Sequence, residues 1–247
     1  MGYTSIIKEF VQEFLFFTRY RIRVHITKPK QMYLNGIILA IEDYYPIQAV
    51  KSIYRCRYEA AEARCVLARI DSDDVIMDFG AGIGYISILC AKSIGSERVF
   101  CYEANSQLIP TATRNFEANK VAPVLQNVML GRENGEATFF LGAAFTSSSM
   151  VENVGATQEI NVKAVDINDE IQRRKPTFLI IDIEGGEYEL IPYINFEHVR
   201  KILIELHYQV IGPDKARKVR AHLTRQGFSV DSEISSKSVI YLERLDA

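Results

Sequence analysis

Short apolar runs recur along this chain and stop abruptly at polar or turn-forming residues. The clearest run, Phe178 to Asp182, shows no alternation of apolar and polar positions until its terminal acid. Such a run is typical of a parallel strand covered on both faces. The same reasoning predicts further strands at 75–77, 98–102, 124–128, 131–138, 160–165, 201–207, 228–232 and 238–242.

Between these runs, apolar residues recur three or four positions apart and predict helices. In the stretch 83–93 and just beyond it, Ile86, Leu89, Cys90 and Ile94 fall on one helical face. Further helices are predicted at 58–70, 108–119 and 213–226. Strands that alternate with helices predict an α/β fold with a mostly parallel, doubly wound sheet.

The first 55 residues have a different pattern. Residues 4–23 form an amphipathic helical pattern that combines aromatic residues with three arginines, and 33–39 contains the Asn-Gly pair of a hairpin. We therefore expect an N-terminal extension at 1–55 and one domain at 56–247. The helix either packs on its own domain or on a second subunit, or it lies on an anionic membrane surface as a peripheral contact.

Three glycines at alternate positions follow the strand at 75–77. Gly80, Gly82 and Gly84 lie between that strand and a helix, where they allow a tight turn and a close approach of a ligand to the backbone. Glu103 ends the next strand, near the 20-residue offset expected of an acid that binds ribose hydroxyls. Tyr85 fills the place of the last glycine of a dinucleotide fingerprint. This residue pattern favours S-adenosylmethionine over a nicotinamide dinucleotide as the cofactor.

Acidic residues and one histidine gather where the predicted strands end. Asp78 is expected to meet the ammonium group of the cofactor, while Asp182, Glu184, Glu205 and His207 are candidate catalytic residues. Ligands of an open α/β sheet bind beyond the carboxyl ends of its strands. The cluster suits either a general base that deprotonates a hydroxyl or a divalent cation that lowers the pKa of that hydroxyl. The structural alternative is that Glu205 and His207 only pair with each other and cap loop amides.

Four stretches carry a resemblance to a known family: Asp-Phe-Gly-Ala-Gly-Ile-Gly, Tyr-Glu-Ala-Asn, Asn-Phe-Glu-Ala-Asn and, above all, the segment 182–190, Asp-Ile-Glu-Gly-Gly-Glu-Tyr-Glu-Leu. Over residues 55 to 210 the chain resembles the FkbM-type methyltransferases. The resemblance implies a Rossmann-like class I fold with a seven-stranded sheet, and transfer of a methyl group from S-adenosylmethionine to a hydroxyl of a sugar, glycan or natural product. It also implies that the glycine turn and Glu103 bind the cofactor, and that the segment around Asp182 and Glu184 faces the acceptor.

Two positions depart from the pattern of that family, which commonly has Asn in place of Gly82 and Pro in place of Ala104. Neither change removes a functional group. Asn127, just past the third strand of the sheet, is the residue we expect to contact the adenine.

Composition narrows the function further. With 29 basic and 31 acidic residues the formal net charge is −2, so the total charge gives no indication of a nucleic-acid partner. The small-molecule or glycan acceptor is what the family resemblance implies. The four cysteines have no metal-site spacing, and we expect reduced core thiols in a cytoplasmic protein. Two other functions are kept as alternatives: a non-catalytic, methyltransferase-like binding protein that uses its N-terminal helix, and a nicotinamide-dependent oxidoreductase.

Overall fold

The computed structural model of this chain describes residues 18–142 and 156–244. Most of the predicted helix at 4–23, and residues 143–155 between two of the predicted strands, lie outside the described residues. Within the described part, residues 18–22 are helical and continue into η1 (Arg23–Thr27). None of the described helices combines the length and the apolar character that crossing a membrane requires.

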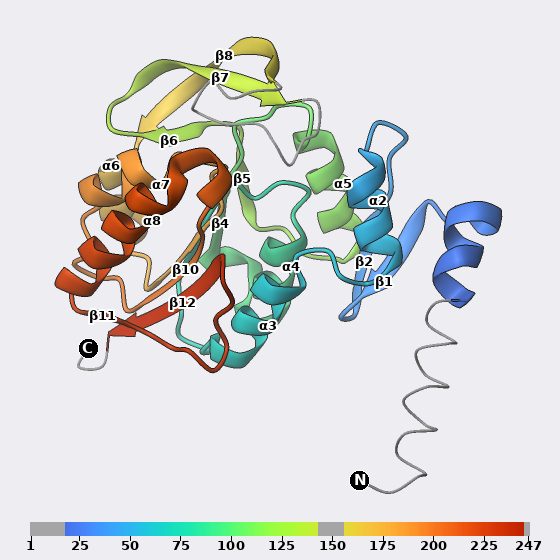
Figure 1. The fold of residues 1–247 in the computed structure, drawn as a ribbon, viewed down its shortest axis with the longest axis horizontal. Coiled ribbons are helices and arrows are strands. Elements are labelled where there is room, and N and C mark those ends of the chain that lie inside the picture. The colour runs from blue at the N-terminus through green and yellow to red at the C-terminus, as the bar shows by residue number, and fades with distance from the viewer. Residues whose placement is uncertain (1–17, 143–155, 245–247) are drawn as a thin grey trace, which may run out of the picture.

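A sheet of seven strands forms the centre of the molecule, and its order is β11-β12-β10-β9-β3-β4-β5 (Figure 1). Its strands are β3 (Ile76–Phe79), β4 (Val99–Tyr102), β5 (Val124–Gln126), β9 (Phe178–Ile181), β10 (Lys201–Glu205), β11 (Phe228–Val230) and β12 (Val239–Arg244). Neighbours from β5 to β10 pair in parallel, whereas β12 is antiparallel to both β10 and β11. The sheet confirms the predicted class I methyltransferase fold.

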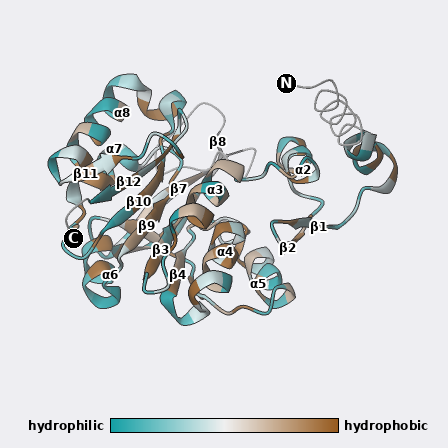
Figure 2. Cartoon of the chain, turned by 90° about the horizontal axis from the view of Figure 1, so that it is seen from below, coloured by the Kyte–Doolittle hydropathy of each residue, from teal (hydrophilic) through white to brown (hydrophobic). Residues whose placement is uncertain are grey.

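Helices cover both faces of this sheet and bury one apolar core on each. The helices are α2 (Ile47–Tyr54), α3 (Ala60–Arg69), α4 (Tyr85–Ile94), α5 (Ile109–Ala118), α6 (Ile167–Arg174), α7 (Glu187–Leu190) and α8 (Tyr208–Arg225), with single 3-10 turns at η2 (Ser96–Arg98) and η4 (Ile191–Tyr193). Helices α3, α4 and α5 pack on one face and α6, α7 and α8 on the other (Figure 2).

The strand β9 shows why its sequence does not alternate. Phe178 and Ile180 point into the core of α3 to α5, whereas Leu179 and Ile181 point into the core of α6 to α8. Both faces are therefore buried, as the unbroken apolar run predicts.

The strands that follow β5 differ from the prediction in their boundaries. The predicted strand 131–138 is wrong in its bounds, because a bend at 132–134 separates β6 (Met129–Gly131) from β7 (Gly135–Gly142). These strands pair with β8 (Ala156–Asp166), which begins before the predicted strand 160–165, in a second, three-stranded sheet. The helix predicted at 213–226 is confirmed: Gly212, with φ of 78° and ψ of 158°, is not helical and separates it from a short helical segment that begins at Tyr208, and the two together are α8.

The N-terminal hairpin is present and packs on the main domain. Strands β1 (Gln31–Leu34) and β2 (Ile37–Ala40) are joined by Asn35 and Gly36, both with positive φ, as an Asn-Gly hairpin turn requires. The side chain of Asn119 on the main domain accepts a hydrogen bond from the amide of Ile38 and donates one to its carbonyl. The hairpin and α2 thus share one core with α4 and α5, and the division at residue 55 stays a prediction.

The expectation of four core thiols is wrong at one position. Cys65, Cys90 and Cys101 are buried and unpaired, but Cys56 is exposed. It lies in the turn after α2 with φ of 54°, outside any apolar pattern.

Candidate functional site

The three glycines between β3 and α4 have different surroundings, although all have positive φ. A Cβ atom at Gly80 would overlap the carbonyl oxygen of Asp182, and one at Gly84 would overlap the ring of Phe116. A Cβ at Gly82 would meet only ordinary contacts, at 3.9 Å and 4.0 Å. Gly80 and Gly84 are therefore required for close packing, whereas Gly82 borders open space.

That open space is a cavity of about 740 Å³, partly open to solvent, which we call the glycine cavity. It is lined by Tyr58, Glu59, Phe79, Gly80, Gly82, Tyr102, Glu103, Ala104, Leu108, Val128, Met129, Leu130, Phe139, Asp182, Ile183 and Glu184. The cavity lies at the carboxyl ends of β3, β4 and β9, where ligands of open α/β sheets bind.

Glu103 lies in this cavity, as its position at the end of β4 predicts. Its Oε2 accepts a hydrogen bond from the amide of Gly82 at 2.8 Å, and its Oε1 accepts one from the amide of Asn105 at 2.7 Å. Burial raises the pKa of Glu103 to about 7, although both hydrogen bonds oppose the shift. The carboxyl group is held in place, and each oxygen keeps a lone pair for a ligand hydroxyl.

Three of the predicted cofactor residues, Asp78, Gly84 and Asn127, do not line the glycine cavity. Asp78 is 3% exposed and accepts a hydrogen bond from the hydroxyl of Ser87, and burial raises the pKa of Asp78 to about 6. Asn127 donates its side-chain amide to the carbonyls of Glu103 and Ala104 at 2.8 Å and 3.2 Å. The residues that follow Asn127, 128 to 130, line the cavity instead.

The four predicted catalytic residues come together in a second, wider depression, which we call the acidic groove. Strands β9 and β10 are neighbours, so the residues at and beyond their carboxyl ends lie side by side. Asp182, Glu184, Glu205 and His207 all line this groove. Glu62 on α3 adds a further acid from the opposite wall. The convergence predicted from strand order is therefore present.

His207 is the centre of this group. Its Nδ1 lies 2.6 Å from Oε1 of Glu187, and its Nε2 lies 3.1 Å from Oε2 of Glu184 and 3.5 Å from Oδ1 of Asp182. Neutral imidazole has only one N–H, so a ring with carboxylates at both nitrogens is best satisfied as imidazolium. Burial alone would lower the pKa of His207, but hydrogen bonds to Glu184 and Glu187 raise it to about 11.

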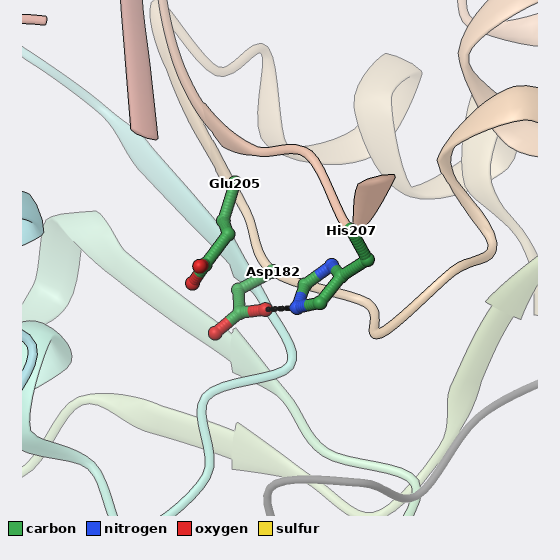
Figure 3. Close-up of side chains that lie close together, drawn as sticks. All are labelled: Asp182, Glu205 and His207. Atoms are coloured by element: carbon green, nitrogen blue, oxygen red, sulfur yellow. Dashed lines mark ion pairs between the residues drawn. The ribbon is translucent and has the colours of Figure 1, made fainter. Parts of the chain in front are cut away.

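Asp182, Glu205 and His207 are also the residues whose types would suit a divalent cation. One ligand atom from each lies within 4.8 Å of the other two (Figure 3). A histidine binds a metal through a nitrogen lone pair, however, and a doubly hydrogen-bonded imidazolium offers none. The arrangement is an ion-pair network, and a cation could use it only if His207 gave up a proton.

The carboxyl groups of this network are poor acids. Burial, and then the neighbouring charge of Glu184, raise the pKa of Asp182 well above its ordinary value. Burial, and then Glu62, raise the pKa of Glu205 to about 7. Figure 3 shows one carboxylate oxygen of Asp182 directed at the ring of His207 and the other directed away from it. A carboxylate with such a pKa can accept a proton near neutrality.

Three functional residues were missed by sequence reasoning. Tyr58 and Glu59 precede α3, and together with Asp182 and Glu184 they line both the glycine cavity and the acidic groove. The sequence places them in the first turn of a helix, 58–70, that is expected to lie across the cofactor pocket, but it assigns neither residue a role. Glu187 lies within the segment of the family resemblance, so its acid was visible, but only the fold brings it to Nδ1 of His207.

The comparisons with known proteins fit this arrangement. A family model described as "Methyltransferase FkbM domain" matches residues 78–230, more than half of the chain. The comparison with curated proteins found no match.

Among solved structures, the methyltransferase FkbM from Methylobacillus flagellatus KT is 16% identical, with a TM-score of 0.46. The match covers 82% of this chain and 55% of that one, so the chain spans about half the length of that protein. Precorrin-6y C5,15-methyltransferase from Geobacter metallireducens GS-15 is 14% identical, with coverage of 75% and 86% and a TM-score of 0.44. TYW2 from M. jannaschii, solved in complex with AdoMet, is 12% identical, with coverage of 87% and 86% and a TM-score of 0.40.

Proposed function

The chain belongs to the FkbM methyltransferase family, whose members use S-adenosylmethionine, and we propose that it methylates a hydroxyl oxygen of a small-molecule or glycan acceptor. One observation carries this proposal. The glycine cavity and the acidic groove share Tyr58, Glu59, Asp182 and Glu184, so a cofactor in the first and an acceptor in the second would meet at a wall of carboxyl groups.

The lining of the glycine cavity supports a cationic nucleoside as its ligand. Four of its residues carry carboxyl groups, namely Glu59, Glu103, Asp182 and Glu184, and no lysine, arginine or histidine is found among the described residues that line it. S-adenosylmethionine carries an ammonium and a sulfonium group against one carboxylate. The pyrophosphate of a nicotinamide dinucleotide is an anion, and this lining offers it no basic side chain. The cavity therefore fits S-adenosylmethionine better than the dinucleotide.

Each part of the cavity would hold one part of that cofactor. The carboxyl group of Glu103 would bind the ribose hydroxyls, and the backbone at Gly80 and Gly82 would lie along the methionine. The apolar side chains at 128–130 and Phe139 would enclose the adenine.

In this proposal Asp182 removes the proton of the acceptor hydroxyl, because its carboxyl group borders both spaces and has a raised pKa. S-adenosylmethionine supplies an electrophilic methyl group on a good leaving group. His207, held as imidazolium by Glu187 and Glu184, is not the base but orients Asp182 and Glu184. Alignment of the acceptor by these fixed groups contributes much of the rate.

Calorimetric titration of the purified protein with S-adenosylmethionine, S-adenosylhomocysteine and NADH tests the cofactor. We expect micromolar binding of the two sulfur nucleotides and none of NADH. Failure of both sulfur nucleotides to bind would refute the proposal.

A screen of hydroxylated acceptors with radiolabelled cofactor then tests the reaction. Asp182→Asn is expected to bind the cofactor normally and to reduce turnover at least a hundredfold, in line with the contribution of a positioned base. Full turnover by Asp182→Asn would exclude Asp182 as the base. Cofactor binding without turnover on any acceptor would favour a non-catalytic binding protein.

A further inference from the structure

We propose that Glu59 is the residue that binds the ammonium group at the methionine end of S-adenosylmethionine. The inference rests on the proposed function and adds to it a binding residue that neither the sequence pattern nor the family match indicates. The matched family segment begins at residue 78, so Glu59 lies outside it.

The backbone places Glu59 where the two spaces meet. It is the residue before α3 and has φ of 43° and ψ of 40°, a left-handed conformation that is uncommon for residues other than glycine. It borders the glycine cavity together with Gly80 and Gly82. Backbone strain of this kind persists where the surrounding structure enforces it, and often at binding sites.

The acids near the glycine loop have different partners, and the partner of Glu59 is the neutral hydroxyl of Tyr58. Asp78 is bonded to Ser87 and does not line the cavity. Glu103 accepts two backbone hydrogen bonds at the end of β4, where the ribose is expected. Asp182 and Glu184 lie against the ring of His207.

Glu59 differs from these acids in its charge environment. Within residues 18–142 and 156–244 no ion pair joins Glu59 to a basic side chain. Burial, and then the neighbouring Glu62, raise its pKa well above the ordinary value. A cation that arrives beside this carboxyl group would favour its charged form and offset the cost of its burial.

The test compares Glu59→Gln with the wild-type protein against three ligands in calorimetric titrations. S-adenosylhomocysteine keeps the ammonium group but has no sulfonium, and 5′-methylthioadenosine has neither. Glutamine keeps the shape of the side chain and removes its charge. Glu117→Gln, an exposed residue of α5, makes the same change of net charge away from the cavity and is the matched control.

We expect Glu59→Gln to weaken the binding of S-adenosylmethionine and S-adenosylhomocysteine about 10- to 100-fold, the loss typical of a charged hydrogen bond. The affinity for 5′-methylthioadenosine should not change. Unchanged 5′-methylthioadenosine binding also shows that the variant is folded. Glu117→Gln should bind all three ligands as the wild type does.

Three results would overturn the assignment. If the binding of all three ligands weakened equally, Glu59 would only shape the wall of the glycine cavity. If only the binding of S-adenosylmethionine weakened, Glu59 would lie beside the sulfonium group. Unchanged binding of every ligand would exclude Glu59 while leaving the proposed function intact. By contrast, a wild-type protein that binds none of the ligands would reject the proposed function itself, and this assignment with it.

Discussion

Alanine substitutions at Gly80 and Gly82 should have very different effects, although both glycines lie in one turn and have positive φ. At Gly80, with φ of 81°, the new Cβ would overlap the Asp182 carbonyl oxygen and lie 2.9 Å from the Asp182 carbonyl carbon. That carbonyl belongs to the neighbouring strand end, so relief requires β3 and β9 to move apart. At Gly82, with φ of 56°, the Cβ meets nothing closer than 3.9 Å.

The magnitudes follow from these contacts. A left-handed alanine costs about 1–2 kcal/mol at either position. At Gly80 the displaced backbone also loses two hydrogen bonds, from the Gly80 amide to Tyr102 and from the Asp182 amide to Phe79. Each is worth about 1 kcal/mol. The lower entropy of an unfolded chain with alanine offsets about 0.4–1 kcal/mol of this, so we expect Gly80→Ala to lower the free energy of unfolding by about 2–4 kcal/mol.

At Gly82 the strain is partly offset by a lower entropy of the unfolded chain. Gly82→Ala should cost at most about 1 kcal/mol, and Gly82→Asn less, because Asn tolerates the left-handed region. Urea unfolding of the three variants measures these differences. Equal destabilisation by Gly80→Ala and Gly82→Ala would refute the reasoning, since strain at φ alone would then explain both.

Three further predictions concern single contacts. Glu103→Ala should weaken the binding of S-adenosylmethionine at least tenfold in a titration. Unchanged affinity would reject the proposal that Glu103 binds the ribose. NMR titration of the four histidines should show His207 protonated throughout pH 6–8, because its pKa is raised to about 11. Glu187→Gln should lower that pKa, and a wild-type His207 that titrates near 6.5 would contradict the ion-pair network. Protonated His207 stabilises the folded protein fully below about pH 6.5, the pKa of histidine in the unfolded chain. This stabilisation is lost as the pH rises toward the pKa of about 11 in the folded protein. Lys201→Met should lower the unfolding free energy by about 3 kcal/mol, because it leaves the fully buried Asp74 without the ammonium group 2.8 Å away; unaltered urea unfolding would disprove this.

The order of the sheet and the main acids of the site are accessible from the sequence for a simple reason. Runs such as 178–181 are apolar throughout because both faces are buried, and the chain leaves each strand through a polar residue at the same edge of the sheet. Asp182 and Glu205 are therefore recognisable as site residues before any contact is known.

Other features depend on contacts between distant segments and leave no local pattern. Glu59 is an acid before a helix like many others, and only the approach of α3 to the end of β9 places it at the cavity. The side chain of Asn127 follows a strand end, as a ligand contact would, but two backbone carbonyls engage it. The break between β6 and β7 is different, because the polar run at 132–134 marks it in the sequence and the predicted strand 131–138 passes over it.

The position of β12 has a consequence for the limits of the folding unit. The segment that similarity identifies ends at residue 230, yet β12 (Val239–Arg244) comes later and separates β10 from β11. At the other end, Ile37 and Leu39 of the hairpin lie before residue 78 and are fully buried. A chain trimmed to its recognisable segment would lose an interior strand and part of a core. In this protein the segment recognised by similarity is smaller than the packed core, and boundaries for shortened versions should follow burial instead of similarity.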